Sequence, residues 1–215
     1  MRVERLSERV AILRDLPNEA WRISRVLNAQ AWPDLEEAVP SYETIGLYFT
    51  EPIIDLSRVE AMVSDLSQGK ADVPNPNIHT LPVCYELGED LAEVASTLGQ
   101  STETVISNHL SQEYQCFAVG FSPGFAYLGY LQPAISGLPR LSSPRVRVEP
   151  GSVGITGRQT AVYPSATPGG WNLIGRCPLT LVDGEDGYFP IEAGNEVRFR
   201  RIDEAEFQQL LGERL

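Results

Sequence analysis

The segment that decides the fold of this chain runs from Pro144 to Arg176 and reads PRVRVEPGSVGITGRQTAVYPSATPGGWNLIGR. Short runs of β-branched and aromatic residues alternate in it with glycine and proline, which destabilise a helix by about 1 and about 3 kcal/mol respectively. Closely spaced short runs between turns are typical of a β-sandwich or a β-barrel. We therefore expect strands at 146–148, 153–156, 160–163 and 171–174.

The turn-rich pattern extends beyond this segment. Of the 18 glycines, 13 lie between residues 120 and 194, together with nine of the 16 prolines, so few long helices fit there. We expect further strands at 179–182 and 196–200, with a turn at 184–187 between them. Residues 203–206 read DEAE, a capping-box pattern that opens a C-terminal helix.

Towards the N-terminus the periodicity changes. Residues 10–13 and 44–49 suit strands, while 19–31 and a segment starting at 55–57 have helical spacing. This order predicts a small strand–helix–strand–helix unit. Residues 73–78 contain two prolines and no periodicity, so they are the expected linker.

Three further elements are expected between the linker and the turn-rich half. Residues 81–85 suit a strand, a helix from Leu91 is closed by Gly99, and Ser101 caps a second short helix. We accordingly predict an α+β protein with one domain at 1–76 and another at 77–215.

The charge is unevenly distributed. With 17 basic and 29 acidic residues the net charge is −12, which argues against partners that need a positive surface, such as nucleic acid or an anionic membrane. Five arginines (140, 145, 147, 158 and 176) and one acid, Glu149, give residues 140–176 a charge of +4 and leave −16 elsewhere. This cationic segment is a candidate site for a carboxylate or phosphate, because arginine binds either bidentately. Alternatively, strand arginines protect exposed sheet edges.

Other residues leave alternatives open. The stretches Phe121–Tyr127 and Thr167–Trp171 suit either pocket-forming loops or corners that bury an aromatic ring. His109 lies on the apolar side of its helix, as either a structural residue or a general base.

A few residues limit which cofactors and which cell compartment are expected for this protein. Lys70, the only lysine, lies outside any phosphate-loop pattern. Cys84, Cys116 and Cys177 lack metal or disulfide spacing and are expected to be reduced and buried in a cytoplasmic protein. The charged N-terminus predicts no signal peptide, and no apolar run is long enough for a membrane span.

Six motifs in order carry a resemblance. They are LPVCY from Leu81, DLAEVA from Asp90, VGFSPGFAYL from Val119, PRVRVEPGSVGI from Pro144, QTAVYP from Gln159 and PGGWNLIGR from Pro168. Together they resemble the signature of the family of 5-oxoprolinase B subunits, within a superfamily that includes allophanate hydrolase subunit 1 and the sporulation kinase inhibitor. The chain departs from the family at 148–152, where it reads VEPGS rather than VPAGS, and at 161–162, where Ala-Val replaces Gly-Ile.

The resemblance implies a ferredoxin-like α+β domain followed by a cyclophilin-like β-barrel. It implies ATP-dependent opening of 5-oxoproline to glutamate by an assembly with a homologous 5-oxoprolinase C subunit and a lactam-utilisation subunit, the chain being inactive alone. ATP would be bound in the assembly, with Mg²⁺ as a candidate companion, and no biotin is expected on this chain. Two other activities stay open: inhibition of a sensor histidine kinase, and a carboxyltransferase or allophanate hydrolase-type role in urea metabolism.

The resemblance also implies a site for a small carboxylate. His109, Arg145 and Gln159 are the predicted catalytic residues, and no metal ligand is predicted. The predicted substrate-binding residues are Gly124, Tyr127, Tyr163, Pro168, Gly169, Gly170, Trp171 and Arg176.

Overall fold

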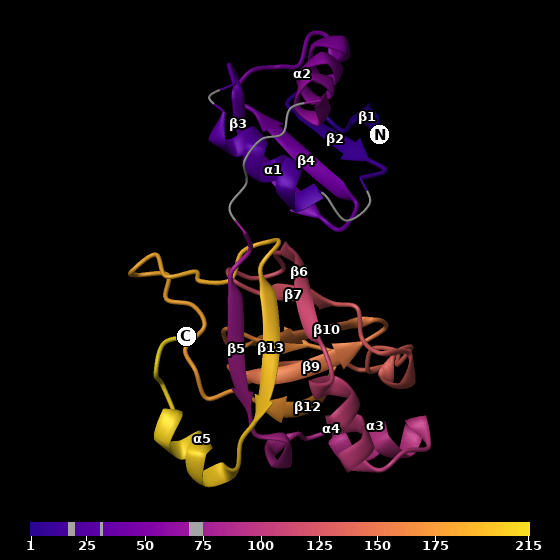
Figure 1. Cartoon of the computed structure of the whole chain (residues 1–215), viewed down its shortest axis with the longest axis vertical. Coiled ribbons are helices and arrows are strands. Elements are labelled where there is room, and N and C mark those ends of the chain that lie inside the picture. The colour runs from indigo at the N-terminus through magenta and orange to yellow at the C-terminus, as the bar shows by residue number, and fades with distance from the viewer. Residues whose placement is uncertain (17–19, 31, 69–74) are drawn as a thin grey trace. The chain divides into compact units, whose positions relative to one another are not determined.

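The computed structural model describes residues 1–16, 20–30, 32–68 and 75–215 (Figure 1). By its contacts the chain divides into two compact units, Met1–Asn75 and Pro76–Leu215. That residues 1–76 and 77–215 fold as independent domains stays a prediction. Lys70 and residues 73–74 of the expected linker lie outside the described residues.

The first unit is a four-stranded antiparallel sheet of order β1-β2-β4-β3 with two helices. Its elements are β1 (Arg2–Arg5), β2 (Val10–Arg14), α1 (Ala20–Ala29), β3 (Leu35–Ser41), β4 (Thr44–Phe49) and α2 (Leu56–Gln68). Leu13, Leu27, Ile45 and Leu47 are fully buried at its core. The predicted strand–helix–strand–helix order was incomplete, because it omitted the edge strands β1 and β3.

The second unit is built on a seven-stranded sheet of order β12-β9-β10-β7-β6-β13-β5. The strands are β5 (Ile78–Val83), β6 (Glu113–Val119), β7 (Ala126–Gly129), β9 (Ser152–Thr156), β10 (Gln159–Val162), β12 (Asn172–Arg176) and β13 (Glu196–Arg201). The sheet curls until its two edges meet. Cys84, directly after β5, exchanges backbone hydrogen bonds of 2.8 and 2.9 Å with Arg176 at the end of β12. The protein is therefore a mixed α/β fold with a nearly closed sheet barrel.

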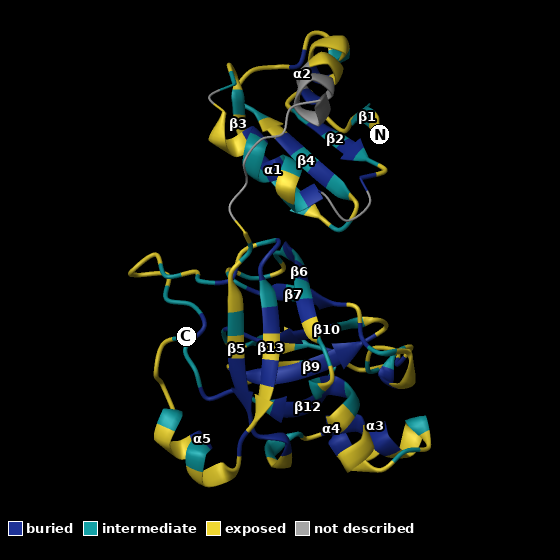
Figure 2. Ribbon diagram, viewed as in Figure 1, coloured by how far each residue is buried: buried dark blue, intermediate teal, exposed yellow. Residues whose placement is uncertain are grey.

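The barrel is filled by apolar side chains. Leu81, Tyr85, Tyr114 and Ile155 are fully buried in its largest core cluster, and Figure 2 shows the buried stretches following the strands. This core is separate from that of the first unit among the described residues.

Three helices of the second unit begin or end as the sequence predicted. The α3 helix (Leu91–Leu98) ends at Gly99, whose φ of 65° is left-handed, and α4 (Thr102–Leu110) is capped by Ser101. Asp203 accepts a 2.8 Å hydrogen bond from the Glu206 N–H at the start of α5 (Glu204–Leu210). No described helix is long and apolar enough to cross a membrane.

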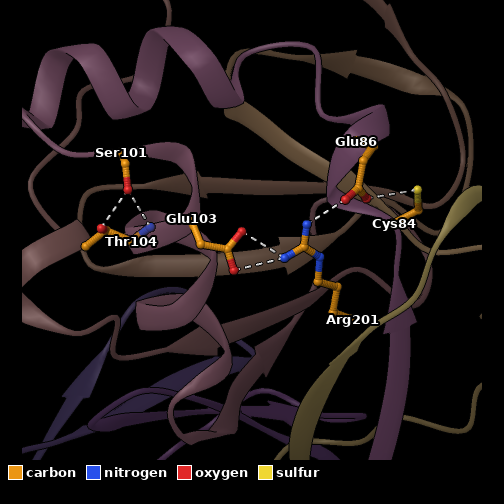
Figure 3. Close-up of polar contacts among 6 residues, drawn as sticks. All are labelled: Cys84, Glu86, Ser101, Glu103, Thr104 and Arg201. Carbon is orange, nitrogen blue, oxygen red and sulfur yellow. Dashed lines mark hydrogen bonds and ion pairs between the residues drawn. The ribbon is translucent and has the colours of Figure 1, made fainter.

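One ion-pair network holds α4 to the barrel. Arg201 of β13 lies between Glu86 and Glu103, at 2.6 and 2.9 Å, as Figure 3 shows. Glu86 belongs to a 3₁₀ turn, η1 (Tyr85–Leu87), and Glu103 to α4. Because two carboxylates occupy this guanidinium, its role in the structure is to join elements.

The strand predictions in the turn-rich half were largely confirmed. One was wrong: residues 179–182 form only an isolated bridge, between Thr180 and Arg214. The turn at 184–187 is present, closed by a bridge between Asp183 and Tyr188. A small two-stranded sheet pairs β8 (Arg145–Val148) with β11 (Thr167–Gly169).

Candidate functional site

A hollow of about 210 Å³ gathers most of the predicted substrate-binding residues. Its walls are formed by Phe121, Phe125, Tyr127, Arg140, Pro144, Tyr163, Pro168, Gly169, Gly170 and Trp171. Six of the eight predicted residues are among them. Gly124 and Arg176 are not, and the binding role of all eight stays a prediction.

The walls are held by an aromatic cluster centred on Phe125. Its ring makes edge contacts with Tyr127, Tyr163 and Trp171, at centroid distances of 5.0, 5.2 and 5.6 Å. Such edge-to-face contacts stabilise fixed ring positions. The hollow therefore has a preformed aromatic surface of the kind that holds a small planar ligand.

Strand β11, which contains the wall residues Pro168 and Gly169, approaches the Tyr163 side chain closely. A Cβ atom at position 169 would lie 2.5 Å from Tyr163 Oη, so only glycine allows this approach. Gly124, by contrast, serves packing: its φ is +73° and a Cβ there would lie 2.0 Å from Val182 Cγ1.

Arg145 is engaged by carboxylates of the chain itself. Its Nη2 donates to Asp90 Oδ1 at 2.6 Å and its Nε lies 3.4 Å from Glu89. Asp90 also accepts from the Leu173 N–H at 2.6 Å, and Arg145 Nη1 donates to the Trp171 carbonyl at 3.4 Å. Arg145 thus ties the start of α3 to the strand that follows Trp171. Its predicted catalytic role remains a prediction, and in this structure it positions a wall of the hollow.

Arg176 and Gln159 lie outside the walls of the hollow. Arg176 is five residues beyond Trp171, which is about 16 Å along an extended chain. Its Nη2 donates a hydrogen bond to the Pro150 carbonyl at 3.3 Å. Gln159 begins β10, about 13 Å along the strand from Tyr163. Their predicted roles stay predictions.

His109 lies on the other side of β10 from the hollow. Its Nε2 is 2.9 Å from Thr160 Oγ1 and its ring stacks on Phe199 in the barrel core, at 4.4 Å. Ala161 and Tyr163, on the opposite face of the strand, belong to the aromatic cluster. Since strand residues alternate between faces, one layer of backbone separates His109 from the hollow.

The hydrogen bonds of His109 define its tautomer. Thr160 Oγ1 donates to the Gly154 carbonyl at 3.1 Å, so it accepts from His109 Nε2, while Nδ1 accepts from the Tyr85 hydroxyl at 2.7 Å. Complete burial lowers the pKa of His109 to about 3, so the ring is neutral. The geometry favours the structural interpretation of this histidine over the general base.

Few groups of the described part of the chain are suited to nucleophilic or acid–base chemistry. Burial raises the pKa of the Cys116 and Cys177 thiols to about 12, and all three cysteines are buried and unpaired. Burial also raises the pKa of Tyr163, so its phenol stays protonated and can donate a hydrogen bond. No cluster of His, Cys, Asp or Glu that could hold a metal occurs among the described residues.

Four wall residues were not among the predicted site residues: Phe121, Phe125, Arg140 and Pro144. Arg140 was recognised within the cationic segment but was in none of the six motifs. Phe121 is 64% exposed at the hollow with a φ of 72°, a left-handed conformation that strains a non-glycine residue. A backbone conformation of this kind has no sequence signal in an aromatic residue.

A second, larger hollow of about 490 Å³ lies in the first unit. It contains none of the predicted site residues, and three acids, Asp34, Glu51 and Asp55, line it with one cation, Arg58. Because acids outnumber bases there, it is poorly suited to an anionic substrate.

The sequence and the fold of this chain agree with a known class of domain. Residues 5–188 match the family model "Carboxyltransferase domain, subdomain C and D". Among solved structures, 91% of this chain aligns with the TTHA0988 chain at a TM-score of 0.77 and 35% identity. The chain spans only 40% of that longer protein. The Kluyveromyces lactis urea carboxylase aligns over 96% of this chain and 22% of its own, at a TM-score of 0.71 and 17% identity, which shows the shared fold alone.

Within that class, the chain belongs to the family of 5-oxoprolinase B subunits. The B subunit of Bacillus subtilis 5-oxoprolinase is 37% identical over 196 residues, covering 84% of this chain and 81% of the relative. The B subunit of Escherichia coli O157:H7 5-oxoprolinase is 39% identical over 183 residues, covering 83% of each chain.

Proposed function

We propose that this chain is the B subunit of a cytoplasmic, ATP-dependent 5-oxoprolinase that opens 5-oxo-L-proline to L-glutamate. The family relationship supports the reaction class, and the aromatic hollow supports a small planar substrate. At about 210 Å³, it is smaller than the roughly 300–1,000 Å³ of pockets for drug-sized ligands. We place the lactam there and ATP, with any Mg²⁺, elsewhere in the assembly. In this proposal the two units are the ferredoxin-like and cyclophilin-like domains of the family.

The observation that carries the need for partners is the chemistry of the walls. In the described part of the chain, the titratable side chains of the walls are one arginine and two tyrosines, with no carboxylate, histidine or cysteine. Such a surface can bind and orient a substrate, but it lacks a general base with a pKa near neutrality. We therefore assign substrate binding to this chain and the activating chemistry to a homologous C subunit and a lactam-utilisation subunit.

Reconstitution tests the proposal. The chain is mixed with both partner proteins, 5-oxoproline and ATP, and glutamate and phosphate release are followed while each component is omitted in turn. We expect turnover only from the complete set. Glutamate release by the chain alone, or none from the complete set, would contradict the proposal.

The two other activities make different predictions in the same preparation. A kinase inhibitor would suppress autophosphorylation of a sensor histidine kinase without consuming 5-oxoproline. A urea-metabolism subunit would depend on a biotinylated partner. Either result in place of glutamate formation would replace the 5-oxoprolinase assignment.

A further inference from the structure

Resting on the function proposed above, we propose that Arg140 binds the carboxylate of the small substrate in the aromatic hollow. Among the residues that the structure describes, the walls contain this one charged side chain and no acid. A guanidinium in such a setting is a specific receptor for a planar anion, because it offers paired N–H donors to both carboxylate oxygens.

Arg140 differs from its neighbours in the cationic segment. Arg145 is held by Asp90 at 2.6 Å, and Arg147 by Glu149, also at 2.6 Å. Arg158 lies over the Tyr130 ring, 4.3 Å from its centroid, and Arg176 donates to the Pro150 carbonyl. Within the described part of the chain, Arg140 has no hydrogen bond or ion pair. In a chain of 29 acidic residues, a cation without a carboxylate beside a ligand-sized hollow is available for an external anion.

The backbone on both sides of Arg140 is fixed to the wall of the hollow. Asn172 Nδ2 donates to the Pro139 carbonyl at 3.0 Å, and the Leu141 N–H donates to the Gly170 carbonyl at 2.7 Å. The base of the side chain packs beside Gly170, and its charge acts on the phenol of Tyr163. The base of the side chain is thus fixed at the wall of the hollow, so the guanidinium is within reach of a ligand bound there.

This arrangement gives the two ends of a lactam acid separate partners. The ring lies against the aromatic walls, and the carboxylate projects towards Arg140. A charge-assisted pair of hydrogen bonds then determines selection for substrates that carry a carboxylate.

The test compares two ligands that differ only in the carboxylate, 5-oxoproline and 2-pyrrolidinone, by calorimetric titration of the full chain. We expect the wild-type chain to prefer 5-oxoproline. Arg140→Gln should weaken 5-oxoproline binding by about tenfold or more while leaving 2-pyrrolidinone unchanged. The matched control is Arg147→Gln, an exposed arginine outside the hollow, which should bind both ligands as the wild type does.

Several results would overturn the assignment. They are no 5-oxoproline binding by the wild-type chain, unchanged binding by Arg140→Gln, and equal losses in Arg140→Gln and Arg147→Gln. Thermal unfolding of each variant checks that it is folded.

The assembled enzyme separates this proposal from the preceding one. In an active assembly, Arg140→Gln should raise KM for 5-oxoproline by about tenfold with kcat little changed, as for an interaction made equally in ground and transition states. An active assembly with unchanged KM keeps the function and overturns the role of Arg140. An inactive wild-type assembly whose chain still selects the carboxylate through Arg140 overturns the function and keeps the binding site.

Discussion

At the scale of single residues, Arg145 and Asp90 form the most enclosed ion pair of the site, with side chains 23% and 10% exposed. We predict that Arg145→Ala lowers the free energy of unfolding by about 2 kcal/mol, because it leaves the Asp90 carboxylate partly buried without its charge partner. Urea denaturation measures the change, with Arg147→Ala as an exposed control whose unfolding midpoint should not move. A wild-type midpoint for Arg145→Ala, with activity lost, would instead mark Arg145 as a substrate ligand.

His109 makes the stability depend on pH. Its pKa is about 3 in the folded chain against 6.5 for an exposed imidazole, so the unfolded chain binds the proton more tightly between these values. The contribution of His109 to the free energy of unfolding is therefore fully present above about pH 6.5. It is lost as the pH falls towards about 3, by up to about 1.4 kcal/mol per pH unit.

We predict that His109→Gln, which keeps hydrogen-bonding groups beside Tyr85 and Thr160, flattens this decline. The measurement is the free energy of unfolding in urea between about pH 6.5 and pH 5, above the range where carboxylates titrate. Parallel profiles for the variant and the wild type would contradict the neutral, buried state of His109.

At the scale of elements, the sequence did not predict β6, β7 and β11, nor the edge strands β1 and β3, whose omission has a clear physical cause. The edge strands β1 and β3 contain RVER and the acidic pair Glu36 and Glu37, and charges there protect open edges while hiding the apolar alternation. The helices of the second unit were predictable because Ser101, Gly99 and Asp203 are local caps.

The candidate site was predictable in part because some of its signals, like the helix caps, are local in sequence. Its glycine–proline loops are continuous in sequence, so their residues could be named. The +4 charge of residues 140–176 did not indicate which arginine lines the hollow, because a sum over one segment ignores carboxylates from elsewhere. Asp90, 55 residues before Arg145, neutralises the arginine that the motifs favoured. Arg140 stands out only after such pairings are known.

The close approach of β11 to Tyr163 can be tested with two adjacent glycines. We predict that Gly169→Ala lowers the free energy of unfolding by about 2 kcal/mol, because its methyl group would overlap the buried Tyr163 ring. Gly170→Ala is the matched control, since its methyl group would lie 3.6 Å from the nearest atoms, on Pro144. Thermal or urea unfolding of both variants gives the comparison, and equal losses would show that this close approach is not the constraint.

At the scale of the whole molecule, each unit has its own buried core among the described residues. We predict that residues 77–215 fold alone, with one cooperative unfolding transition and native aromatic circular dichroism. Asn77 has to be included, because its carbonyl accepts a 2.9 Å hydrogen bond from the Glu196 N–H beside β5. NMR spectra of the fragment and of the full chain would contradict this prediction if only the full chain gave dispersed amide signals. The second unit would then depend on the first for folding.

The closure of the barrel has a consequence for how the molecule opens. The bridge between Cys84 and Arg176 joins the two ends of one continuous sheet, so it is the contact that closes the barrel. Parting it would leave two unpaired strand edges, β5 and β12, each able to recruit the other edge from a second molecule. We therefore expect strand exchange between copies to begin at this closing bridge. Aggregation on heating would begin at the same place.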